Sequence, residues 1–102
     1  MKGLAVTMTV TAVSDIRNIV RYIARDNSSA ARKFEEEFWL AVDRIRVFPQ
    51  TGYAIPQPDG AFLAVRVSAR FKRYSVVYRV LSDEELEVVR VLHGARDMRA
   101  LL

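Results

Sequence analysis

Three arginines and one histidine in the second half of the chain are the residues best suited to chemistry: Arg66, Arg79, Arg90 and His93. The planar fork of a guanidinium group can bind both oxygens of a phosphate or a carboxylate at once. Histidine can act as an acid or a base near neutral pH, and Asp97 lies close enough in the sequence to orient it. The set therefore suits either the binding of an anion or acid–base chemistry on one.

The charge of the surrounding segment favours this interpretation. From Phe62 through Ser82 the chain has five basic residues and no acidic one, and residues 61–102 hold eight basic and five acidic side chains. That difference of three supplies most of the formal net charge of +4. The alternative is that the arginines only solubilise an exposed sheet face. For His93 the alternative is a half-buried side chain bonded to the backbone.

Composition excludes several classes of site. The chain has 102 residues, no cysteine and one histidine, so disulfides, thiol catalysis and an ordinary zinc site are ruled out. There is no glycine-rich phosphate loop and no serine elbow. We therefore expect no cofactor and no metal. The length suits a single domain over residues 1–102.

The balance of 16 Lys and Arg against 12 Asp and Glu favours acidic partners, which include nucleic acid, anionic lipid and an acidic protein. Threonines interrupt the apolar run at the N-terminus, which makes it a poor signal peptide. No apolar stretch approaches the roughly 20 residues that span a membrane. We expect a cytoplasmic protein with no membrane partner.

The first half of the chain predicts one strand followed by a helical hairpin. Leu4–Met8 is rich in β-formers. From Val13, apolar residues recur at helical spacing, after a cap at Thr9 or Thr11, and the helix should end near Asn27, which tolerates the left-handed conformation.

A second helix should begin with Ser28 or Ser29 as its cap and stop before Pro49. Its core stripe includes Phe38, so the neighbouring Trp39 points elsewhere and is a candidate for a protein contact.

The second half predicts an antiparallel meander of three strands, Phe62–Ser68, Tyr74–Val80 and Leu86–Leu92, after one long loop, Pro49–Gly60. In register, the three arginines named above would share the polar face of strands about 5 Å apart and form one basic patch. The tail from Gly94 forms a last helical turn or stays extended. The fold class is α+β.

Taken in order, these elements resemble the ParE branch of the ParE/RelE toxin family, the toxin halves of bacterial type II toxin–antitoxin pairs. The stretches that carry the resemblance are Asp15–Asn27 (DIRNIVRYIARDN), Ile45–Gly52 (IRVFPQTG), Tyr74–Val80 (YSVVYRV) and Val88–Asp97 (VVRVLHGARD). Their order and spacing span nearly the whole chain. The resemblance implies a RelE/ParE-like fold of one N-terminal strand, an antiparallel helical hairpin and an antiparallel sheet.

The resemblance also implies partners. They are a cognate ParD-like antitoxin with a ribbon-helix-helix domain and an acidic tail, and DNA gyrase as the target. DNA itself would be reached only through the antitoxin. We expect antitoxin contacts at Tyr22, Phe38 and Trp39 beside the hairpin, and on the sheet at Arg66, Arg79 and Arg90.

The RelE-like alternative is a ribosome-dependent mRNA endoribonuclease, in which Arg66, Arg79 and Arg90 stabilise charge and His93 exchanges protons. Members of that branch carry a catalytic tyrosine or histidine near the C-terminus. Here the tail after His93 has no tyrosine, and no carboxylate is evident beside Arg66. These departures favour the ParE-like branch and a protein that is not an enzyme.

Overall fold

The structure is a computed structural model and describes residues 3–58 and 60–94. Helix α1 (Val10–Asp26) begins directly after Thr9, whose Oγ1 accepts a hydrogen bond from the Ala12 N–H at 3.0 Å. Thr9 is therefore the cap, and the helix starts three residues before the apolar stripe that predicted it. Its half-buried residues pack against the core: Ile16, Ile19, Val20, Ile23.

A single residue, Asn27, joins α1 to α2 (Ser28–Val47). Its N–H donates to the Ile23 carbonyl, and its Oδ1 accepts from the Ala30 N–H at 2.9 Å. Its backbone is extended, with φ at −159°, so the predicted left-handed end is wrong. The predicted serine cap is wrong as well, because Ser28 and Ser29 lie inside the first turn of α2. One residue thus ends α1 through its backbone N–H and begins α2 through its side chain.

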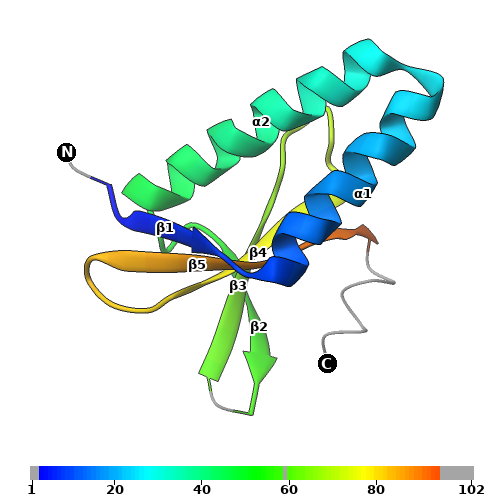
Figure 1. Cartoon of the computed structure of the whole chain (residues 1–102). Helices are drawn as coiled ribbons and strands as arrows, with labels where there is room; N and C mark the ends of the chain where they lie inside the picture. Colours follow the sequence, from blue (N-terminus) through cyan, green and yellow to red (C-terminus); the bar gives the residue numbers. More distant parts are fainter. Residues whose placement is uncertain (1–2, 59, 95–102) are drawn as a thin grey trace.

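The sheet has five strands in the order β1-β5-β4-β3-β2. The meander is confirmed, since β3 (Gly60–Arg66), β4 (Tyr74–Val80) and β5 (Glu85–His93) pair antiparallel. Strand β1 (Ala5–Met8) runs parallel to β5 at the other edge, which makes the sheet mixed. The α+β class, with its first strand and helical hairpin, is confirmed (Figure 1).

The long loop predicted over Pro49–Gly60 is corrected, because it contains β2 (Tyr53–Gln57), which pairs antiparallel with β3. Pro56 weakened the strand signal, yet an edge strand tolerates proline on its unpaired side. Gly60 turns the hairpin with φ at 137°, a conformation that side chains other than glycine rarely adopt.

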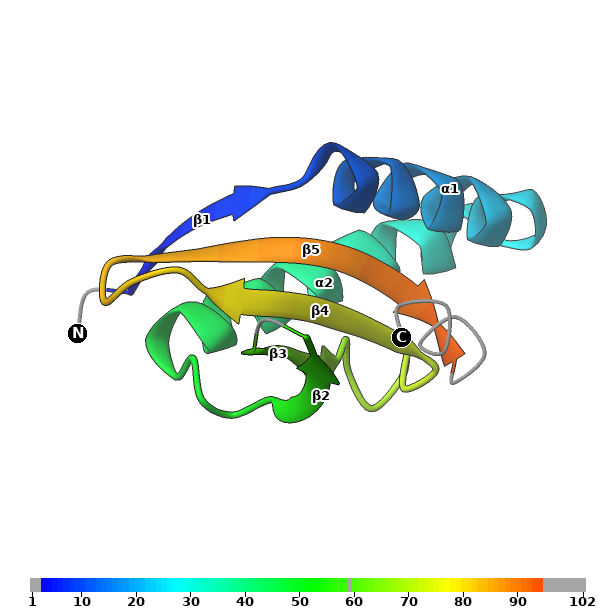
Figure 2. The same cartoon turned by 90° about the horizontal axis from the view of Figure 1, so that it is seen from below.

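Both helices cover one face of the sheet (Figures 1 and 2). The main core fills the space between the helices and the sheet, with residues from α2, from the strands and from the bend directly after β3: Phe34, Phe38, Ala41, Val42, Ile45, Val67, Val76, Tyr78, Leu86, Val88 and Val91. The Tyr78 hydroxyl donates to the Pro49 carbonyl at 2.7 Å and accepts from the Gly52 N–H at 3.2 Å. This pair of bonds ties the chain after α2 to the middle strand.

A smaller apolar cluster lies on the other face of the sheet, where Ile55, Ala64, Val77 and Leu92 meet. Phe48 follows the end of α2 and is 58% exposed. Neither described helix is long and apolar enough to cross a membrane. Beyond Gly94 the predicted tail, with Asp97, falls outside the described residues.

Candidate functional site

The strand register places the three arginines on one face of the sheet, the face opposite the helices. Arg66 lies across from Ser75, and Arg90 lies across from Val77. Arg79 follows at the next position of that face on β4, because side chains alternate along a strand. Shared register does not make the three equivalent, because their partners differ.

Carboxylates hold two of these arginines. Arg79 Nη2 lies 2.9 Å from Glu87 Oε1, the residue directly across from it on β5. Arg90 Nε lies 2.8 Å from Asp15 Oδ2, and its Nη2 lies 3.2 Å from Oδ1. Within the described ranges, no carboxylate lies within ion-pair distance of Arg66, which is exposed at the end of β3. The patch therefore offers less free positive charge than its arginine content suggested.

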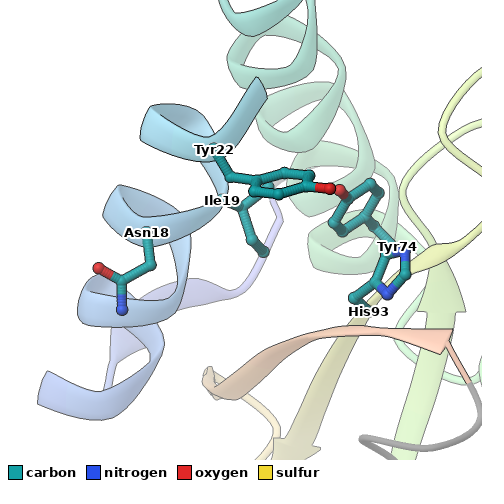
Figure 3. A pocket seen from close by; sticks show the side chains of 5 residues that line it. All are labelled: Asn18, Ile19, Tyr22, Tyr74 and His93. Atoms are coloured by element: carbon teal, nitrogen blue, oxygen red, sulfur yellow. The ribbon is translucent and has the colours of Figure 1, made fainter. Parts of the chain in front are cut away.

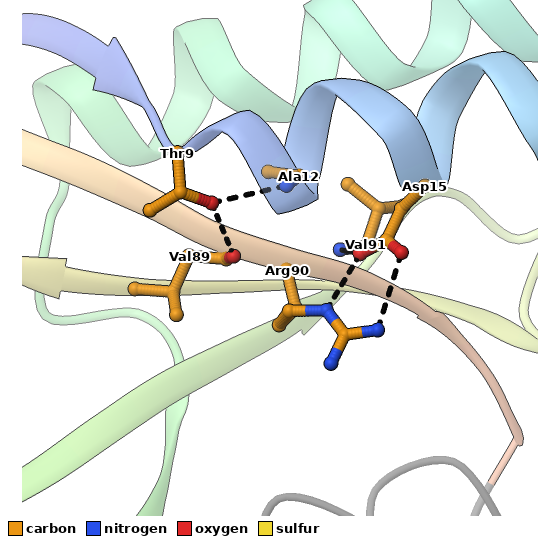
Figure 4. Close-up of polar contacts among 6 residues, drawn as sticks. All are labelled: Thr9, Ala12, Asp15, Val89, Arg90 and Val91. Atoms are coloured by element: carbon orange, nitrogen blue, oxygen red, sulfur yellow. Dashed lines mark hydrogen bonds and ion pairs between the residues drawn. The ribbon is translucent and has the colours of Figure 1, made fainter.

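Asp15 neutralises Arg90 and also accepts a hydrogen bond from the backbone of the edge of β5 that β1 does not cover. Strand β1 pairs with β5 only as far as Val88, and α1 then takes its place. Past that point Thr9 Oγ1 donates to the Val89 carbonyl at 2.7 Å, and Asp15 Oδ2 accepts from the Val91 N–H at 3.0 Å (Figure 4). The side chains of Thr9 and Asp15 thus pair with backbone groups of β5 that β1 leaves unpaired.

His93 lies on the other face of the sheet from Arg66 and Arg79. It is directly across from Tyr74, and the two rings stand 4.8 Å apart between centroids. Arg79 is five residues along β4 from Tyr74, or about 17 Å at strand spacing. Only Arg90, at the strand edge, lines a groove together with His93. The structure therefore brings Arg90 and His93 together and places Arg66 and Arg79 on the other face of the sheet.

An aromatic slot lies where α1 faces the ends of β4 and β5. It has a volume of about 320 Å³ and is lined by Asn18, Ile19, Tyr22, Tyr74 and His93 (Figure 3). The Tyr22 side chain is 66% exposed, and its hydroxyl points toward that of Tyr74. Burial raises the pKa of Tyr74 above its ordinary value, and the neighbouring Tyr22 raises it further. The Tyr74 phenol is therefore a neutral donor over the ordinary pH range.

The two aromatic residues of α2 have different environments. Phe38 has no exposed surface and belongs to the core, so the expectation that a partner touches it directly is corrected. Trp39 stacks edge-on against Phe38 at 5.0 Å and is 50% exposed, and the adjacent Leu40 is 57% exposed. This apolar pair is separate from the aromatic slot, which α1 and the strands form.

Two features of this region were missed from the sequence. The first is the pairing of Asp15 with Arg90, which spans 75 positions of the sequence. The second is the position of Tyr74, which is only half-buried and lines the slot. The available signal was Asp15 itself, a lone carboxylate on the apolar side of an arginine-rich helix. Among the described residues, no cluster of three or more His, Cys, Asp or Glu could hold a metal.

Comparisons with known proteins agree on one family. The family model for "ParE toxin of type II toxin-antitoxin system, parDE" matches residues 6–98. A solved structure titled "Chromosomal ParDE TA system from P. aeruginosa" is similar at a TM-score of 0.69 and 16% identity, covering 89% of this chain and 96% of that one. The "YoeB/ParE toxin from Agrobacterium tumefaciens" is similar at 0.59 and 19%, covering 89% and 99%. No curated protein matches.

Proposed function

Because this chain belongs to the ParE toxin family of type II toxin–antitoxin systems, we propose that it binds and inhibits DNA gyrase and that a cognate ParD-like antitoxin neutralises it. The activity is one of binding: the chain acts by covering a surface of its target. The antitoxin carries a ribbon-helix-helix domain, which contacts operator DNA, and an acidic tail, which contacts the toxin.

The observation that carries this proposal is the separation of the arginines from His93. Cleavage of RNA at its own 2′-hydroxyl needs an acid–base group and a charge stabiliser at one phosphate, within hydrogen-bond reach. Here the sheet stands between His93 and both Arg66 and Arg79. The remaining arginine near His93 is held by both oxygens of Asp15. A binding mechanism requires no such convergence.

The direct test is a supercoiling assay with purified gyrase, relaxed plasmid and the purified chain. We expect loss of negative supercoiling as the chain is added, and recovery when the neighbouring antitoxin is mixed in first. A chain denatured and refolded in the presence of antitoxin serves as the matched inactive control. Full supercoiling at a large molar excess of the free chain would refute gyrase inhibition.

For the antitoxin we propose two contact regions. The first is apolar, with Tyr22 on α1 and Trp39 on α2, both at least half exposed. The second is the basic sheet face, where Arg66 is the arginine with no carboxylate beside it in the described part of the chain. Arg79 and Arg90 would share their guanidinium groups between the acidic tail and their present partners. Titration calorimetry with Trp39→Asp is expected to weaken binding, and full affinity would remove Trp39 from the interface.

The RelE-like alternative retains one supporting observation. Arg90 and His93 line the same groove of about 220 Å³, together with Asp15 and Asn18. A charge stabiliser, a possible proton donor and a carboxylate are thus within one surface depression. Ribosome-dependent cleavage of messages by the purified chain would favour this alternative over gyrase inhibition.

A further inference from the structure

The aromatic slot has a lining that suits a flat ring. Tyr22 and Ile19 of α1 form one side, and Tyr74 and His93 at the strand ends form the other (Figure 3). Its volume of about 320 Å³ lies at the lower end of the range for small-ligand pockets. Nucleic acid bases stack on such exposed aromatic side chains whatever their sequence, because every base has a π face. The Asn18 amide at the rim can donate to and accept from the edge of a base.

Basic residues lie close in the sequence to the residues that line this slot. Arg21 and Arg25 flank Tyr22 on α1, and the turn before Tyr74 holds three more basic residues: Arg70, Lys72 and Arg73. No ion pair neutralises any of these five in the ranges that the structure describes. Asp26, at the end of α1, offsets only part of their charge.

A second groove on α1 adds one further arginine, Arg17, beside Arg21. It has a volume of about 360 Å³, is bordered by Arg17 and Arg21, and shares Asn18 with the slot. Successive arginines on one face of α1 lie about 6 Å apart, given a rise of 1.5 Å per residue. A chain of phosphates can therefore follow the helix while one of its bases enters the slot.

We propose that this end of the molecule, the aromatic–basic end (Tyr22, Tyr74, His93, Arg21, Arg25), binds a single strand of nucleic acid. One base stacks in the slot, and the neighbouring phosphates lie on the arginines. A duplex fits less well, because its bases are paired and stacked inside the helix. An acidic peptide would satisfy the arginines but would leave the two-sided aromatic lining unused.

The inference is independent of gyrase inhibition, and it differs from the expectation that DNA is reached only through the antitoxin. It is tested with the full chain and a fluorescein-labelled oligothymidylate of about 12 nucleotides, a length within the site sizes of single-strand binders. We expect the fluorescence anisotropy to rise on binding, and the affinity to fall steeply as salt increases. Tyr22→Ala should raise the Kd by about tenfold.

Matched variants separate stacking from general electrostatic attraction. Tyr22→Phe keeps the ring and should bind as the wild type does. Tyr53→Ala removes a tyrosine of similar exposure, 54%, from β2 and should also leave the Kd unchanged. Arg25→Gln should reduce the slope of log affinity against log salt by about one unit. Equal losses in Tyr22→Ala and Tyr53→Ala would overturn the stacking site.

Competitors identify the ligand. Free thymidine monophosphate is expected to compete weakly, because it offers one phosphate, and an equimolar duplex of the same length should compete less than the unlabelled single strand. Thymidine monophosphate competing as well as the strand would overturn the assignment to a strand. A polyglutamate peptide that binds as tightly as the oligothymidylate, with the same loss in Tyr22→Ala, would overturn the assignment to nucleic acid.

Discussion

At the scale of single residues, Asp15 is the side chain on which the edge of the sheet depends most. It accepts two hydrogen bonds from the Arg90 guanidinium and one from the Val91 N–H, and its side chain is only 15% exposed. Asp15→Ala leaves that half-buried cation and that backbone donor without this acceptor. We expect it to lower the free energy of unfolding by about 3 kcal/mol, measured by urea denaturation.

Asp43 provides the matched control for that substitution. Its ion pair with Arg46 spans three positions on α2 at 3.6 Å, and both side chains are largely exposed. Asp43→Ala should therefore cost about 0.5 kcal/mol or less. Asp15→Asn keeps an acceptor for the Val91 N–H and should fall between the two. If Asp15→Ala and Asp43→Ala destabilise equally, the role assigned to Asp15 is wrong.

Tyr78 makes the stability of the fold decrease at alkaline pH. Burial raises the pKa of its hydroxyl, and bonds with Gly52 and Thr51 offset part of the rise. The folded chain then holds this proton more tightly than the unfolded chain. The stability that the protonated Tyr78 hydroxyl contributes is therefore complete below about pH 10, the ordinary pKa of tyrosine. It is lost as the pH rises through the higher folded pKa.

Tyr78→Phe should remove part of that dependence. We expect the free energy of unfolding of the wild type to fall above about pH 10, and that of Tyr78→Phe to fall less steeply. At pH 7 the same variant should be less stable by about 1 to 3 kcal/mol, because the Gly52 N–H and the Pro49 carbonyl lose their partner. Urea denaturation across the alkaline range measures both effects, and identical slopes would contradict the assignment.

At the scale of elements, Thr9 ends β1 and begins α1. Its hydroxyl oxygen accepts from the Ala12 N–H, and its hydroxyl donates to the Val89 carbonyl. Thr9→Ala should lower the melting temperature and cost about 1 to 2 kcal/mol, in the range of helix N-caps. Thr11→Ala, inside the helix at an exposed position, should be neutral or slightly stabilising because alanine has the higher helix propensity. Equal effects of the two would argue against the cap.

Elements with strong local patterns could be predicted from the sequence, and elements defined by distant partners could not. The β4 bounds and both helices follow from periodicity of two and of 3.6 residues. Strand β2 was hidden by Pro56, because its strand character depends on pairing with β3. Likewise, Asn27 caps α2 because α1 ends one residue before it. The local capping preference of Ser28 and Ser29 could not reveal this arrangement.

The candidate site was predictable in its residue types but not in its arrangement. The alternation of side chains along each strand correctly assigned the three arginines to one face of the sheet. That assignment depends only on the strand register. It could not show that Glu87 and Asp15 neutralise two of them, because one partner lies on the next strand and the other on a distant helix. His93 was grouped with the arginines by proximity in sequence, whereas the pleat of β5 directs it to the other face.

At the scale of the whole molecule, the sheet separates two surfaces of different chemistry. The helix side carries the aromatic slot and the arginines of α1, and the far side carries Arg66 above a small apolar cluster. The β2–β3 hairpin projects away from the helices (Figure 1). A partner that wraps the chain can cover both surfaces at once, whereas a catalytic site that used Arg66 or Arg79 together with His93 would need them to meet.

The most direct test of a binding mechanism is to induce wild type and His93→Ala in cells and to follow growth, plasmid supercoiling and message integrity together. We expect both proteins to arrest growth and to reduce negative supercoiling, with messages intact by primer extension, because the proposed binding mechanism assigns no chemistry to His93. Codon-positioned cleavage of messages by the wild type, lost together with toxicity in His93→Ala, would contradict the account.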